Sequence, residues 1–256
     1  DTTANWQGGT TPADRGDNDN ELVFSTNTNG NNPRSNLGSY GQPFDVNQLT
    51  FASGMSSVNI ECPANHYLNF IQNTSGTDAG ITQNSDNDQE IEHVGVQSTQ
   101  ILNIQGTGTG TLTMNHPYDS MGLGRHLEIN SGTFNVMVPA MVRVNTSSLD
   151  VNNNLSSSNY VQADSFDLRS NRNLKLEGSG HTLVTGNIFE TSSTSSLSIQ
   201  STGSAILNGV NSHTGGTAVE YTSGTTVGGT GSFTSSGFVV QLSAAGSTIA
   251  PGVGDY

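Results

Sequence analysis

Two short acidic segments carry residues of the type that binds calcium. The first covers residues 14–21 and the second residues 86–90. Calcium takes about six to eight oxygen ligands, and alternating Asp and Asn side chains can supply several of them from one loop. Neither segment has the glycine and the distal glutamate of an EF-hand loop, so a solvated acidic turn is the alternative for each. The candidate calcium ligands are Asp17, Asp19, Glu21, Asp86, Asp88 and Glu90.

A second group mixes carboxylates with basic residues. It consists of Asp164, Asp167, Arg169, Arg172 and Lys175. Enzymes on parallel β-helices that cleave acidic polysaccharides need paired carboxylates, or a basic residue beside a calcium cluster, on adjacent coils. Charge pairing between neighbouring strands accounts for the same residues without any catalysis. We expect this structural role, with the middle residue of each strand facing outward.

Three further motifs predict little. The six histidines have no metal-ligand spacing, and no Gly-x-Ser-x-Gly segment occurs. Residues 15–17 spell Arg-Gly-Asp, a tripeptide that some animal cell-surface receptors bind and that arises by chance in such a segment. The threonines at positions 107, 109, 111 and 113 would suit an ice-binding face only if the pattern recurred on successive coils, and it occurs once. We therefore expect no catalytic centre and no tightly bound cofactor, with calcium left open.

The composition favours short strands joined by turns. Ser, Thr, Asn and Gly account for 123 of the 256 residues, and these residues favour turns over helix interiors. Leu, Ile, Val and Phe total 55 residues, close to the level of about 20% below which a chain is expected to be disordered. Because the net charge is −14, a disordered acidic chain is the alternative, and periodicity has to decide.

Charge and cysteine content exclude several classes of protein. Lys and Arg total 7 residues, so the basic surface that binds phosphate backbones is lacking and we expect no nucleic-acid partner. Cys62 is the single cysteine and cannot form an intrachain disulfide. No apolar run approaches the roughly 20 residues of a membrane-spanning helix. The start at Asp1 fits either a processed, secreted chain or a boundary chosen within a longer chain.

A recurring apolar–polar–apolar triplet predicts short β-strands. Alternation with a period of two places both apolar residues on one face and the middle residue in solvent. Charged residues such as Glu128, Arg143 and Lys175 occupy the middle position. The triplets are centred on Asn103, Thr113, Glu128, Asn135, Arg143, Asp150, Asp167, Lys175 and Ser198.

The triplets recur with a period of about 22–25 residues, which predicts stacked coils. Each coil would contain three short strands and bury a narrow core against its neighbours. The fold class that we expect is therefore all-β, a right-handed parallel β-solenoid, with a β-sandwich as the alternative. The aligned series are Leu127, Leu149, Leu174 and Leu197; Val142, Phe166 and Ile188; and Leu112 with Phe134.

The first 57 residues differ from the rest. They hold Trp6, the only tryptophan, and three of the seven prolines. Because a solenoid must cover its open core and sheet edge, we expect an N-terminal cap over residues 1–57 and the solenoid proper over residues 58–256. Residues 21–24 and 48–51 are the strand candidates within the cap.

Both ends of the chain resemble bacterial surface proteins that carry autotransporter-associated β-strand repeats. Near the N-terminus the similar stretches are residues 5–9 (Asn-Trp-Gln-Gly-Gly), Pro12, residues 16–17, 22–24 and 46–54, and then 81–85 and 89–91. Near the C-terminus they are residues 228–233 and 246–252. The resemblance becomes weaker across residues 95–220. It implies a large, secreted or surface-displayed β-helix with an adhesive or structural use.

We therefore expect an extracellular structural or adhesive surface protein, and not an enzyme. A chain with open coil ends can assemble into a homo-oligomer or fibre through its terminal strands, and a cell-surface glycan is the other expected partner. The alternative function is a β-helix lyase or hydrolase that acts on extracellular polysaccharides.

Overall fold

The computed structural model describes residues 19–25, 43–61, 66–97, 99–116, 122–144, 148–169, 171–192, 194–219, 224–234, 240–242 and 245–252. In these residues the chain forms only strands, turns and bends, and every strand pair is parallel. The strands stack into a β-solenoid of about eight turns. Parallel pairing confirms the solenoid and rules out the antiparallel β-sandwich. No described segment forms a helix of the length and hydropathy needed to span a membrane.

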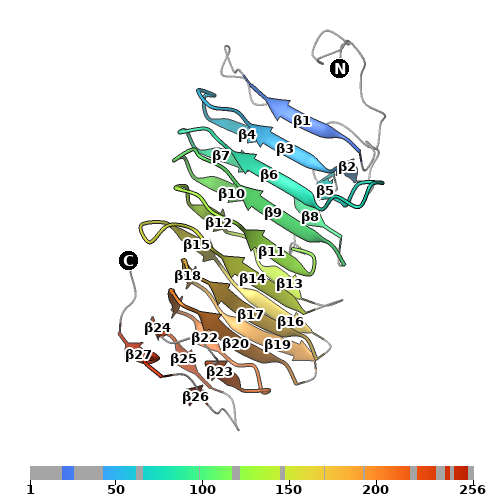
Figure 1. Cartoon of the computed structure of the whole chain (residues 1–256). Helices are drawn as coiled ribbons and strands as arrows, with labels where there is room; N and C mark the ends of the chain where they lie inside the picture. Colours follow the sequence, from blue (N-terminus) through green and yellow to red (C-terminus); the bar gives the residue numbers. More distant parts are fainter. Residues whose placement is uncertain are drawn as a thin grey trace.

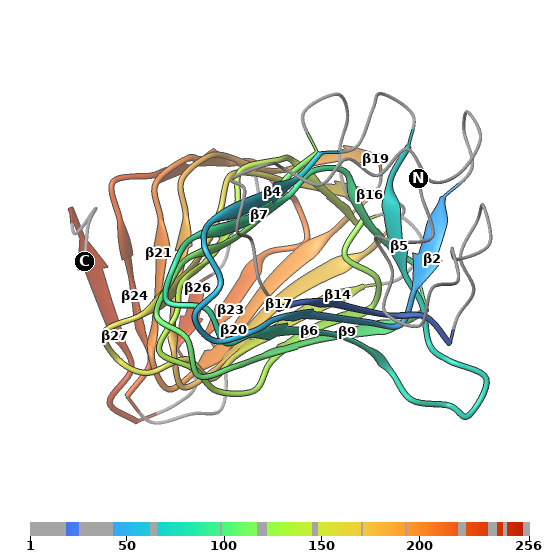
Figure 2. The same cartoon turned by 90° about the horizontal axis from the view of Figure 1, so that it is seen from above.

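Two long parallel sheets form two sides of the solenoid (Figures 1 and 2). The ten-stranded one, called the long sheet below, consists of β1 (Glu21–Phe24), β3 (Gln48–Phe51), β6 (Ala79–Gln83), β9 (Ile101–Gln105), β11 (His126–Ile129), β14 (Leu149–Asn153), β17 (Asn173–Gly178), β20 (Ser196–Ser201), β23 (Thr217–Val219) and β26 (Val240–Leu242). The nine-stranded sheet consists of β4 (Val58–Ile60), β7 (Gln89–Ile91), β10 (Leu112–Met114), β12 (Val136–Val138), β15 (Tyr160–Ala163), β18 (His181–Val184), β21 (Ser204–Leu207), β24 (Thr226–Gly229) and β27 (Thr248–Pro251).

The third side is divided into three short sheets. The first contains β2 (Phe44–Val46), β5 (Leu68–Phe70) and β8 (Val94–Val96). The second contains β13 (Val142–Val144), β16 (Phe166–Arg169) and β19 (Ile188–Ser192), and the third contains β22 (Val210–Asn211) and β25 (Ser232–Phe233). Seen along the stack, β2 and β5 lie at the side between the two long sheets (Figure 2). Most coils therefore contribute one strand to each side; among the described residues, the coil of β9 and β10 has only an isolated bridge, from Leu123 to Val96, on the third side.

The alternating burial of the strands explains how so little apolar sequence can form a core. Most strands bury two residues and leave the middle one partly exposed, as in β13 and β10. The buried side chains of all three sides meet in one continuous cluster that includes Phe44, Leu102 and Leu176. Seven of the nine predicted triplets lie in strands with this pattern, and in an eighth, in β16, the middle residue Asp167 is buried as well.

The triplet of residues 134–136 does not form a strand, and two alignments were wrong. Phe134 is buried but precedes β12, which runs from Val136 to Val138. Its ring lies against the backbone of Gly132, where any Cβ would overlap it. Consequently Leu112 pairs with Val136 instead of Phe134. In the same way Leu127 pairs with Val151 instead of Leu149, because the corners differ in length while the alternation of apolar residues gives no unique register.

The other alignments are confirmed by the register. Leu149 pairs with Leu174, which pairs with Leu197, and Val142 pairs with Phe166, which pairs with Ile188. The coil length nevertheless varies more than the sequence indicates. It is 23 residues from β17 to β20 (Leu174 to Leu197), but 32 residues from β3 to β6 (Gln48 to Gly80).

Asn and Asp side chains at the corners bond each coil to the next. The Asn154 Oδ1 accepts a hydrogen bond from Ser179 N, one coil later, at 3.2 Å. Asn135 binds Tyr160 N, and Asn208 binds Thr230 N, in the same way, at 3.1 Å each. These bonds satisfy backbone amides that lie outside the sheets. This explains much of the high Asn content.

The threonine run at positions 107–111 belongs to such a corner. Thr107, Thr109 and Thr111 donate their backbone amides to Asn84, Asp86 and Asp88 at 3.0, 3.2 and 2.7 Å. The intervening Gly108 lies so close to the carbonyl of Ser85 that a Cβ would overlap it. The run is therefore a contact between two coils, and Thr113 lies apart from it in β10.

Within the proposed cap, both strand candidates are confirmed as β1 and β3. They pair with each other, and β3 continues the long sheet to β6. Residues 1–18 and 26–42, which include Trp6 and residues 15–17, lie outside the described residues. The division at residue 57 between cap and solenoid stays a prediction.

Candidate ligand-binding groove

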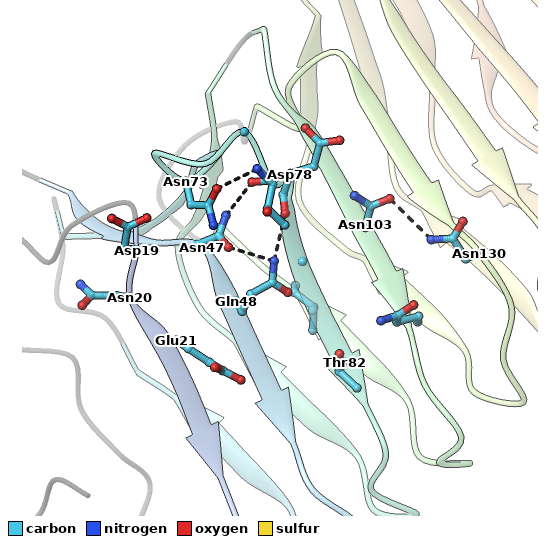
Figure 3. Close-up of a pocket in the computed structure, with 15 residues that line it drawn as sticks. Asp19, Asn20, Glu21, Asn47, Gln48, Asn73, Asp78, Thr82, Asn103 and Asn130 are labelled. Atoms are coloured by element: carbon cyan, nitrogen blue, oxygen red, sulfur yellow. Dashed lines mark hydrogen bonds between the residues drawn. The ribbon is translucent and has the colours of Figure 1, made fainter. Parts of the chain in front are cut away.

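A polar hollow of about 680 Å³ lies on the outward face of the long sheet, near the end that begins with β1 (Figure 3). It extends from β1 across β3, β6 and β9 to the end of β11. We call it the polar groove. Carboxylates, amides and threonine hydroxyls make up its polar lining: Asp19, Glu21, Asp78, Asn20, Asn47, Gln48, Asn73, Asn103, Gln105, Asn130, Thr77 and Thr82.

The absence of a side chain at Gly80 makes room for Gln48 on the floor of the groove. The strand register forms one outward row in which Glu21, Gln48, Gly80 and Asn103 follow one another from coil to coil. A Cβ on Gly80 would lie 2.5 Å from the Oε1 of Gln48, so the Gln48 side chain extends over this position. Its Nε2 donates to the backbone oxygen of Asp78 at 2.9 Å, which fixes the amide at the floor.

One wall is the loop of residues 71–78, which lies in the 32-residue coil between β3 and β6. Asp19 accepts hydrogen bonds from the backbone amide of Thr74 at 3.1 Å and from its Oγ1 at 2.9 Å. The Nδ2 of Asn47 donates to the carbonyl oxygens of Ile71 and Thr77 at 2.9 and 3.0 Å. These contacts hold both ends of the loop, so the wall is part of the folded structure.

The opposite wall comes from the next two coils. Asn103 and Gln105 project from β9, and Asn130 follows β11. The Asn130 Nδ2 donates to Asn103 Oδ1 at 3.5 Å (Figure 3). Side-chain amides can donate and accept at once. The wall can therefore bind a ligand that also does both, such as one with hydroxyl groups.

The charge of the groove restricts its ligand. Three carboxylates, Asp19, Glu21 and Asp78, line it, and none of the described lining residues is Lys, Arg or His. The whole chain adds a net charge of −14. Like charges oppose each other in such a site, so the groove disfavours polyanions and suits a neutral, hydroxyl-rich molecule.

The calcium candidates fall into two separate places. Asp19 and Glu21 line the polar groove, while Asp86 and Asp88 accept the backbone amides of the threonine run. Glu90 lies in β7 and accepts a hydrogen bond from Asn115 at 3.3 Å, and Asp17 lies outside the described residues. Among the residues with assigned positions, no three His, Cys, Asp or Glu side chains are grouped to hold a metal ion. Calcium binding by these residues stays a prediction.

The structure divides the group of carboxylates and basic residues between different sides. Asp167 and Arg169, in β16, form an ion pair at 2.6 Å. Lys175 lies on the long sheet and pairs with Glu177 at 2.6 Å, and Asp164 accepts a hydrogen bond from the hydroxyl of Ser165. Asp167 occupies an outward position, as expected, but it is only 1% exposed.

Neighbouring side chains cover Asp167. Its Oδ2 lies 3.7 Å from the Nε of Arg143, which projects from the paired strand β13. Its Oδ1 accepts a hydrogen bond from Thr191 at 2.6 Å. Among the described residues, this carboxylate therefore has an ion pair within β16, a second with β13 and a hydrogen bond from β19.

Histidine contacts between coils were missed in the sequence. The Nδ1 of His93 lies 2.9 Å from the backbone oxygen of His66, and the rings of His93 and His116 are 5.0 Å apart. The separation of His93 and His116 in the sequence matches one coil, which is the signal that could have revealed them. His213 is buried, and this burial lowers its pKa. The negative charge of Glu190 raises the pKa, but by less than burial lowers it.

These observations define a β-solenoid protein with a polar groove on one of its two long sides. No protein-family model matches the chain, and neither the curated proteins nor the solved structures include a significant match to it. The site therefore has to be interpreted from its own chemistry.

Proposed function

We propose that this chain is an extracellular structural or adhesive surface protein that binds a neutral glycan in the polar groove. The observation that carries the proposal is the groove itself, in which fixed amides and carboxylates line a hollow of about 680 Å³. Its volume lies within the range of about 300–1,000 Å³ that is usual for ligand sites. The resemblance of both chain ends to autotransporter-associated repeats supports a location on the cell surface.

The absence of basic residues from the described lining favours binding over cleavage of acidic polysaccharides. Those substrates carry repeated negative charges along the chain and need cationic partners. The neutral glycan instead exchanges hydrogen bonds with amides such as Asn103 and Gln105. The protein acts by holding the glycan, with no chemical step.

Glycan binding is tested by replacing two outward residues of β9 together. The probe is a neutral glycan selected on an array of neutral and uronic-acid polysaccharides. We expect the Asn103→Ala, Gln105→Ala variant to bind it at least about tenfold more weakly, because two hydrogen bonds of about 1 kcal/mol each are lost. Isothermal titration calorimetry measures this. The control is Asn152→Ala, since Asn152 occupies the same outward row outside the groove.

Two results would count against this proposal. Binding only to uronic-acid polysaccharides would contradict the electrostatic argument. Release of new reducing ends or unsaturated products from a bound glycan would assign the groove to the alternative function, a polysaccharide hydrolase or lyase.

We further propose that copies of the chain assemble end to end. Two of the large apolar side chains that are exposed in the described part lie on terminal strands: Val23 on β1 is 51% exposed, and Ile249 on β27 is 48% exposed. The two strands lie at opposite ends of the stack (Figure 1). Edge strands can pair with another chain, so this arrangement favours a fibre.

The assembly is tested by placing charge on both terminal strands. We expect wild-type protein at high concentration to form rods in negative-stain micrographs, and the Val23→Lys, Ile249→Lys variant to stay monomeric, because edge lysines oppose strand pairing. Val210→Lys is the control, since Val210 is 46% exposed but lies in β22, within the stack. Monomeric wild-type protein at every concentration would refute assembly.

A further inference from the structure

A second hollow, of about 450 Å³, lies on the third side of the solenoid over the short sheet β2–β5–β8. We call it the Tyr67 hollow. The register places Asp45, Asn69 and Gly95 in one outward row across these strands. Tyr67, Gln97 and Gly122 also line the hollow. Its residues differ from those of the polar groove.

Two glycines shape this hollow. A Cβ on Gly95 would lie 2.8 Å from the Cδ2 of Tyr67, so the tyrosine ring extends over the position that a side chain would fill. At Gly122, in the next coil, an added Cβ would meet one atom of the described residues within 4 Å, the backbone oxygen of Val96 at 3.9 Å. The floor is thus formed by the half-buried ring of Tyr67 over Gly95 and by open backbone at Gly122.

A carboxylate faces the same space. The Asn69 Nδ2 donates to Asp45 Oδ1 at 2.6 Å, which fixes the orientation of the carboxylate. Burial raises the pKa of Tyr67, and the charge of Asp45 raises it further, so the field of this carboxylate reaches the ring. None of the described lining residues is Lys or Arg, so the lining itself supplies no cation.

We propose that the Tyr67 hollow binds an amino sugar through its free ammonium group. A negative carboxylate beside an aromatic face is the combination that attracts an organic cation. The amides of Asn69 and Gln97 can bind the hydroxyl groups of the attached sugar ring. The open backbone at Gly122 leaves room for that ring beside Tyr67.

The proposal is tested with glucosamine, N-acetylglucosamine and glucose as probes. Calorimetry or NMR titration of the full chain is expected to show binding of glucosamine that weakens as the salt concentration rises, and weaker binding of the two neutral sugars. Asp45→Asn keeps the shape of the side chain and is expected to weaken glucosamine binding about tenfold. The control, Asp150→Asn, removes a carboxylate from the long sheet and should leave glucosamine binding unchanged.

The tyrosine is tested by a pair of variants. Tyr67→Phe keeps the ring and should retain glucosamine binding, whereas Tyr67→Leu should weaken it at least about threefold. Equal affinity for glucosamine and glucose, or an Asp45→Asn variant with unchanged affinity, would overturn the proposal. Asp45→Asn alone decides the matter if Tyr67→Leu fails to fold. None of these variants changes a residue that lines the polar groove. Failure of this proposal can therefore be distinguished from failure of the proposed glycan binding in the groove.

Discussion

Replacing Gly178 with alanine is expected to lower the free energy of unfolding by about 3 kcal/mol. Gly178 ends β17 with φ of +99°, a conformation that other residues rarely adopt. An added Cβ would also overlap the carbonyl oxygen of Asn153 and lie 2.6 Å from its carbonyl carbon. Because Asn153 belongs to the preceding coil, backbone strain and a clash between coils add together at this position.

The control for Gly178→Ala is Gly54→Ala. Gly54 has φ of +76°, but a Cβ there would meet nothing within 4 Å. This variant carries the backbone strain alone, about 1 kcal/mol. Urea denaturation of both variants, followed by circular dichroism, gives the comparison. Equal losses in the two would show that the approach of Gly178 to Asn153 contributes nothing.

The same close approach shows what the sequence can predict. The apolar–polar–apolar triplets and their shared period predict the parallel solenoid, because each strand buries two residues and each coil repeats that pattern. They do not predict which glycines lie under a neighbouring coil. Gly178 and Gly54 look alike in sequence, and only the stacking of β17 on β14 distinguishes them.

The register errors have a related physical cause. Alternation fixes which side chains face the core, but a shift of two residues preserves it. Phe134, Val136 and Val138 are all buried, so the sequence pattern permits a strand to begin at either of the first two. In the folded coil the Phe134 ring packs against Gly132, where any Cβ would overlap it. This contact leaves Phe134 in the corner before β12, and it exists only once the coil has formed.

The polar groove could be predicted only in part. Asp19 and Glu21 are predicted from the sequence as candidate calcium ligands, and both line the groove. The groove also needs the loop of residues 71–78, which the sequence shows only as one unusually long coil. It needs Gly80 as well, whose position beside Gln48 depends on the strand register. Asn103 and Asn130 join it because consecutive coils bring them together, although neither belongs to a recognisable motif.

Asp167→Ala is expected to lower the free energy of unfolding by about 2 kcal/mol. Loss of a buried carboxylate leaves its partners unpaired, which costs about 3–5 kcal/mol when the partners are buried. The side chains of Arg143 and Arg169 are 28% and 35% exposed, so water reduces this cost. Thermal denaturation measures the effect, and each kcal/mol corresponds to about 2–4 °C for a chain of this size.

The matched control is Asp150→Ala. Asp150 holds the equivalent middle position in β14 and lies 3.3 Å from His126, but its side chain is 26% exposed. A surface pair of this kind is worth about 0–1 kcal/mol. The difference between the two variants therefore measures what burial between two arginines adds to a carboxylate.

The isosteric variant Asp167→Asn separates stability from catalysis. It keeps the size of the side chain, and it removes the charge that holds Arg143 and Arg169 near each other. If the role of Asp167 is structural, we expect this variant to have a lower denaturation temperature. Glycan binding at the polar groove should not change, because Asp167 lies on the third side of the solenoid. An unchanged denaturation curve, together with loss of a polysaccharide-cleaving activity, would instead identify Asp167 as a catalytic residue.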